Sequence, residues 1–138
     1  MLKSQLISML EEPVESQMVL DFLKLFPKQK NPSAMRHYAK IVSILTDRKS
    51  SLLYKEVLSR VKLDPLIETL FTWLIDENVL VATKVHCMQS LANLVTERSW
   101  IKTELLDTID HLTGIESIVF FARAKKVKKT LKKHNDEL

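Results

Sequence analysis

Hydrophobic residues recur along this chain at the three- and four-residue spacing of α-helices, and no segment alternates strictly over the length of a strand. The successive stripes predict about eight helices, with approximate bounds 2–10, 13–26, 32–45, 52–61, 64–75, 79–97, 100–112 and 115–134. Polar stretches of a few residues separate them, so neighbouring helices should run antiparallel. The sequence therefore predicts an all-α fold.

Several residues mark the expected helix ends. Asn31 and Asp64 each precede a proline, which combines a capping side chain with a residue suited to the first helical turn. Ser99 has the same capping position before the helix over 100–112. Gly114 follows that helix and is expected to end it in the left-handed conformation.

The same spacing predicts which side of a helix is buried. For the helix over 32–45 the expected inward stripe is Ala34, Tyr38, Ile41, Val42 and Leu45. Arg36 and Lys40 fall on other sides of that helix and should face solvent.

The composition favours one globular domain spanning residues 1–138, because the chain is 46% hydrophobic and 28% charged. It contains one glycine and one cysteine, which excludes a dinucleotide-binding fingerprint, a P-loop, an internal disulfide and a cysteine-based zinc finger. Acidic residues lie where an export signal would be apolar, and no apolar run is long enough to cross a bilayer. A cytoplasmic location is the resulting expectation.

The formal charge of +4 is unevenly distributed. Residues 119–138 contain seven Lys or Arg and two Asp or Glu, so this segment has a net charge of +5 and the rest of the chain −1. The last helix, over 115–134, is therefore either a solvated cap or a phosphate-binding surface. For nucleic acid, the candidate residues are Arg123, Lys125, Lys126, Lys129, Lys132 and Lys133.

Internal repetition suggests how the helices are arranged. The stretches 22–45, 66–94 and 101–131 share an apolar helix, a short polar turn, and a second helix with a base near its start. These bases are Arg36, Lys84 and Arg123, separated by 48 and 39 positions. HEAT and armadillo units repeat every 40 to 47 residues or so.

A family resemblance rests on two regions. The stretch from Asp64 to Leu91, with a proline-opened first helix, an acidic turn at Asp76 and Lys84 early in the second helix, resembles a HEAT repeat. Residues 79–133 are similar to a group of short bacterial HEAT-like proteins of unknown biochemical role. The resemblance implies a right-handed α-solenoid of antiparallel helix pairs, about three repeats plus a leading helix. It also implies that Lys84 braces the turn, and Asp76 is its expected partner.

Three sites for chemistry are weaker alternatives. Asp107 and His111 have the spacing for two ligands on one helix side, but no third metal ligand is placed. Trp73 with Asp76 is the local candidate for an activity like that of HEAT-like DNA glycosylases. Off the main apolar stripe, Trp73 is expected to pack on the adjacent repeat or line an exposed surface. Cys87 lies on an apolar stripe, where an inert buried thiol is expected.

The sequence thus favours a non-enzymatic interaction or scaffold module, with no cofactor or metal, that binds a protein or peptide along its second helices. The residues expected to contact that partner are Lys40, His86, Gln89 and Asn93. A nucleic-acid-binding protein that uses the basic last helix is the alternative, and the oligomeric state is left open.

Overall fold

Seven α-helices and two 3-10 turns make up residues 15–136, the part of the chain that the structure, a computed structural model, describes. In chain order they are a helix over residues 15–25, η1 (Phe26–Lys28), α2 (Pro32–Leu45), α3 (Leu52–Arg60), α4 (Leu63–Ile75), α5 (Val81–Asn93), η2 (Leu94–Thr96), α6 (Trp100–Leu112) and α7 (Ile118–Asp136). No strand occurs within these residues, which confirms the all-α prediction. About eight helices were expected, and the one over 2–10 lies outside the described residues.

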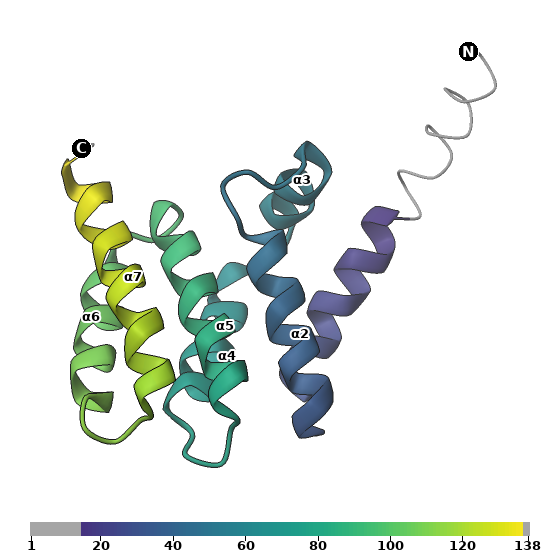
Figure 1. Ribbon diagram of the computed structural model, residues 1–138. Helices are drawn as coiled ribbons and strands as arrows, with labels where there is room; N and C mark the ends of the chain where they lie inside the picture. Colours follow the sequence, from purple (N-terminus) through teal and green to yellow (C-terminus); the bar gives the residue numbers. More distant parts are fainter. Residues whose placement is uncertain (1–14, 137–138) are drawn as a thin grey trace, which may run out of the picture.

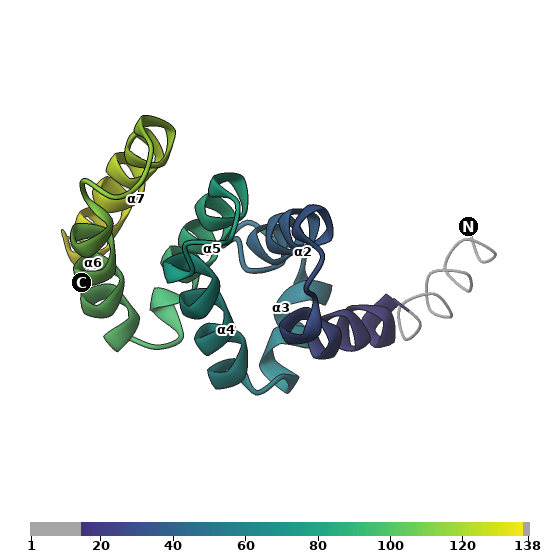
Figure 2. The ribbon, with the colours of Figure 1, turned by 90° about the horizontal axis from the view of Figure 1, so that it is seen from below.

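The helices form two layers (Figures 1 and 2). Helices α2, α5 and α7 lie side by side in one layer, while α4 and α6 lie behind α5 and α7. The helix over residues 15–25 accompanies α2, and α3 lies near the C-terminal end of α2 (Figure 1). Because α5 packs against α2, α4, α6 and α7, it is the central helix of the molecule.

One continuous core joins the two layers. Its largest fully buried side chains include Phe26, Ile67, Met88, Ile101 and Phe120, which come from both layers and from both ends of the described chain. Among residues 15–136, no helix has the length and apolar character needed to cross a membrane.

The proposed helix caps are only partly correct. The Asn31 side chain accepts a hydrogen bond from the backbone N–H of Ala34 at 3.1 Å, as predicted. The prediction for Asp64 is wrong, because α4 already begins at Leu63 and places Asp64 inside its first turn. The prediction for Ser99 is also wrong, because its backbone is helical and its side chain makes no capping bond.

Two later helices also have bounds that differ from the prediction. The helix expected over 79–97 is α5, which ends at Asn93 and continues as the 3-10 turn η2. Gly114 has a φ of 88° after the end of α6, as expected. Helix α7 then begins at Ile118 rather than near residue 115, because the Ser117 hydroxyl accepts the backbone N–H of Phe120 at 3.4 Å.

The inward stripe predicted for α2 is partly wrong. The buried residues are Met35, Ala39, Val42 and Leu45, whereas Ile41 is 41% exposed. The buried side of α2 is therefore centred on Ala39, whose small side chain suits close packing against α5. Arg36 and Lys40 are exposed, as predicted.

Candidate functional site

The four residues expected to contact a protein or peptide come together on the layer formed by α2, α5 and α7. His86, Gln89 and Asn93 are three and four positions apart, so they share one side of α5. Each of them is partly buried. Lys40 is exposed on α2, and its charge acts on His86.

Two of these four residues, Gln89 and Asn93, make hydrogen bonds within the protein. Gln89 donates a hydrogen bond to the Asn93 side-chain oxygen at 3.0 Å. The Asn93 amide donates to the backbone carbonyl of Ser43 at 3.2 Å and to the Thr46 hydroxyl at 3.1 Å. Asn93 therefore joins the C-terminal ends of α5 and α2, which shows that these two helices run parallel.

His86 reports on the electrostatics of this layer. Its pKa is lowered from 6.5, first by burial and then by the positive charges of Lys40, Arg123 and Arg36. Two of these cations come from α2 and one from α7, so they approach α5 from both sides. Cations from two helices that are distant in the sequence thus act on one imidazole of a third.

The Lys and Arg side chains of α7 lie on the sides of that helix that do not face the core. Its buried side is formed by Phe120, Ala124, Val127 and Leu131. Lys128, on the side toward α6, pairs with Asp110 of that helix at 3.0 Å. The six bases proposed for nucleic acid are all exposed: Arg123, Lys125, Lys126, Lys129, Lys132 and Lys133.

Charge is segregated between the two layers. Residues 32–45, 81–93 and 118–133, which belong to α2, α5 and α7, contain two, one and seven Lys or Arg and no Asp or Glu. Residues 15–25 of the helix before α2, 63–75 of α4 and 100–112 of α6 contain seven Asp or Glu and two Lys. The two layers therefore create local fields of opposite sign. The pattern was obscured in the sequence, because α3 interrupts the alternation of helices and the predicted helices over 79–97 and 115–134 include Glu97 and Glu116.

The three bases at corresponding repeat positions do not have corresponding environments. Lys84 is 2% exposed, whereas Arg36 and Arg123 are exposed at the surface. The ammonium of Lys84 binds the Glu116 carboxylate at 2.5 Å and so connects α5 to the link between α6 and α7. The predicted pairing with Asp76 is wrong, because the Asp76 carboxylate instead accepts the backbone N–H of Asn78 at 2.9 Å.

Trp73 is a core residue. It is 5% exposed, and its ring centroid lies 4.4 Å from that of Phe26 in η1. Of the two environments predicted for it, the exposed surface is wrong, and Trp73 instead packs on η1. Because the indole is buried, it is not available to stack on a base beside Asp76.

The other candidate chemical groups are isolated. Within residues 15–136, no group of three His, Cys, Asp or Glu side chains is placed to hold a metal ion. Asp107 and His111 therefore have no third ligand among these residues. Cys87 is fully buried, which raises the pKa of its thiol to about 12. The expected burial of this thiol is confirmed.

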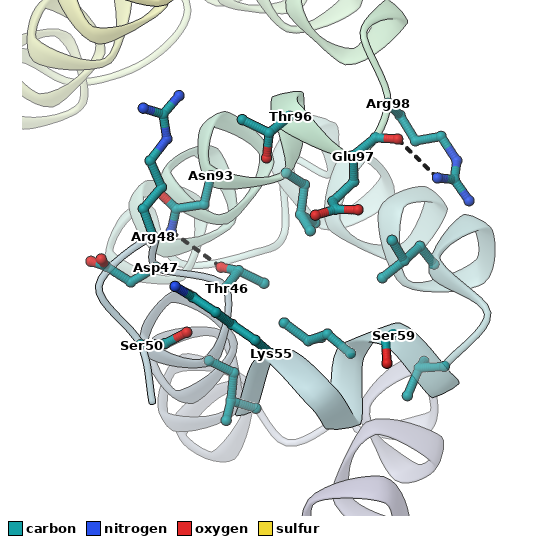
Figure 3. A pocket seen from close by; sticks show the side chains of 15 residues that line it. Thr46, Asp47, Arg48, Ser50, Lys55, Ser59, Asn93, Thr96, Glu97 and Arg98 are labelled. Atoms are coloured by element: carbon teal, nitrogen blue, oxygen red, sulfur yellow. Dashed lines mark hydrogen bonds between the residues drawn. The ribbon is translucent and has the colours of Figure 1, made fainter. Parts of the chain in front are cut away.

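A pocket of about 820 Å³ was not predicted from the sequence. It lies between the loop that follows α2, helix α3 and the η2 region (Figure 3). Asp47 and Glu97 line it together with Arg48, Lys55 and Arg98, so its charges are mixed. This balance favours no single class of ligand, in contrast to the uniform sign of the α2/α5/α7 layer.

No protein-family model, curated protein or solved structure matches this chain. The functional argument therefore depends on the geometry and charge of the chain itself.

Proposed function

We propose that this chain is a non-enzymatic binding module that contacts a negatively charged partner through its α2/α5/α7 layer. The observation that carries the proposal is the lack of any Asp or Glu in the described side chains of three adjacent helices, up to residue 133. A surface with one sign of charge raises the local concentration of an oppositely charged partner and speeds its association.

The proposed architecture is a short right-handed HEAT-like α-solenoid. In its support, α4 packs on α5 and α6 on α7, while α2, α5 and α7 are adjacent. Helix α3 lies between the first and second pairs in the sequence, which accounts for the longer spacing between Arg36 and Lys84. In such arrays the surface formed by the second helices is a common binding surface.

A protein or peptide partner, in a cytoplasmic setting, stays a prediction from the repeat resemblance. Lys40 and His86 are the residues of that prediction whose side chains are not occupied by the Asn93 network. An acidic segment of a protein would suit the same charges.

The test is salt elution from a heparin column, because heparin is a polyanion without base or peptide chemistry. The variant Lys40→Glu/Arg123→Glu/Lys126→Glu reverses exposed charges on the α2/α5/α7 layer. The control Lys24→Glu/Lys55→Glu/Lys62→Glu makes the same change in net charge at exposed positions outside that layer.

We expect the layer variant to elute at a much lower salt concentration than the wild type, and the control to elute close to the wild type. Equal shifts for the two variants would show that heparin responds to net charge alone, and the proposal would then be wrong.

A further inference from the structure

We infer that the negatively charged partner is duplex DNA, contacted along its phosphate backbone across the whole α2/α5/α7 layer. This inference rests on the proposed function and specifies the partner. It differs from binding by the last helix alone, because α2 is required to contribute.

The first argument is the placement of cations in two rows. On α7, Lys126, Lys129 and Lys133 are spaced by three and four positions and share one side of the helix. At about 1.5 Å of rise per residue, this row is about 10 Å long. Arg36 and Lys40 are four positions apart on α2 and form the second row.

The second argument is the separation of these rows. Helix α5 lies between α2 and α7 and packs against both. With about 8–10 Å between packed helix axes, the axes of α2 and α7 that carry the two rows lie about 16–20 Å apart. That separation is enough to reach the phosphates on both sides of a B-form major groove about 12 Å wide. An extended acidic peptide that lies along one row contacts that row alone, and it must cross α5 over about six residues to reach both rows.

The third argument concerns aromatic rings, which single-stranded nucleic acid uses as stacking platforms. The described Phe and Tyr rings of this layer are packed on other rings of the protein. Tyr38 lies against Phe22 with centroids 4.9 Å apart, and Phe121 lies against the buried Phe120 at 6.0 Å. Among its described residues the layer therefore offers charge without a free Phe or Tyr ring for stacking, which favours a duplex over a single strand.

The expected salt dependence follows from the number of cations. Arg123 and the five residues of the two rows give up to six phosphate contacts, because all six side chains are exposed. Six contacts correspond to a slope of about −5 in log K against log salt. Affinity should then fall about 10³-fold between about 50 and 200 mM salt.

The experiment is a fluorescence-anisotropy titration of the purified full chain against three labelled probes: a mixed-sequence DNA duplex, one of its strands, and polyglutamate. Three double variants are compared with the wild type. Arg36→Glu/Lys40→Glu changes the α2 row, Arg123→Glu/Lys126→Glu changes α7, and Lys24→Glu/Lys62→Glu is the control with the same charge change. Circular dichroism checks that each variant is folded.

We expect the duplex to bind at least tenfold more tightly than the single strand or polyglutamate. Each layer variant should weaken duplex binding at least tenfold and reduce the salt slope by about two. The control should stay within about threefold of the wild type. An unchanged affinity for the α2 variant would overturn the inference, because α7 would then bind alone.

The outcomes separate the inference from the proposed function. If polyglutamate binds as tightly as the duplex, the partner is an acidic protein segment, and the inference is wrong while the proposed function stands. Equal binding of single strand and duplex would likewise overturn the inference and leave the proposed function standing. If none of the probes binds and heparin does not retain the protein, both are wrong.

Discussion

Removing only one partner of the buried ion pair between Lys84 and Glu116 should strongly destabilise the fold. The two side chains are 3% and 10% exposed, and their charged atoms are 2.5 Å apart. Removing one partner leaves the other charge buried without compensation, which costs about 3–5 kcal/mol. We therefore expect Lys84→Met to lower the free energy of unfolding by that amount.

The double variant Lys84→Met/Glu116→Leu should recover much of this loss, because replacing both charges by apolar groups removes the uncompensated charge. Urea unfolding, followed by circular dichroism, measures the wild type, the two single variants Lys84→Met and Glu116→Leu, and the double variant. In thermal unfolding the Lys84→Met variant should melt about 10–20 °C below the wild type, at about 4 °C per kcal/mol for a chain of this size.

The exposed pair between Lys128 and Asp110 provides a matched control. Its atoms are 3.0 Å apart, but the side chains are 39% and 68% exposed. Asp110→Asn should therefore cost less than about 1 kcal/mol. If Lys84→Met costs no more than this control, or if the double variant is the sum of its two single variants, the reasoning from burial is refuted.

Three further predictions concern single residues. Because the pKa of Cys87 is raised to about 12, its thiol should not react with a thiol reagent at about pH 8 in the native protein, and should react in urea; rapid native labelling would contradict its burial. Because the pKa of His86 is lowered, the folded state binds a proton there less readily than the unfolded state, and the free energy of unfolding should decrease as the pH falls below 6.5. His86→Gln should weaken this pH dependence in urea titrations. An unchanged pH dependence would refute the prediction. Gly114→Ala should lower the free energy of unfolding by about 1–2 kcal/mol, because alanine rarely adopts a φ of 88°. No atom lies within 4 Å of the added Cβ, so this cost is backbone strain without a steric clash. An unchanged urea midpoint would show that the turn relaxes freely.

Local signals in the sequence predicted the existence of the helices better than their ends. Asn31 caps α2 because the chain is extended at that residue, with a ψ of 121°. Ser99 is also a residue that commonly caps helices, but its ψ of −30° is already helical and its side chain makes no capping hydrogen bond. Residue type therefore indicated where a cap was possible, while the incoming backbone direction decided whether it formed.

The ion-pair partner of the buried Lys84 also could not be predicted from residues close to it in the sequence. Asp76 is eight positions from Lys84 in the sequence, whereas Glu116 is 32 positions away. The nearer carboxylate is exposed and serves the turn that precedes α5, so it does not offset the burial of the ammonium. Only the packing of α5 against α7 brings the link between α6 and α7 next to Lys84.

The charge pattern of the α2/α5/α7 layer is formed by three helices that are separated in the sequence, so no single helix reveals it. Counted along the chain, the positive charge is concentrated in the last helix, and the bases of α2 are compensated by neighbouring acids such as Asp47. The fold separates them, because α2, α5 and α7 are distant in the sequence yet share one layer. The pKa of His86 is lowered first by burial and then by this arrangement, since cations 50 positions before it and 37 positions after it act on the same ring. A binding surface of this kind is therefore recognised by summing charge over the layer, and its function should be lost by reversing charges on either α2 or α7.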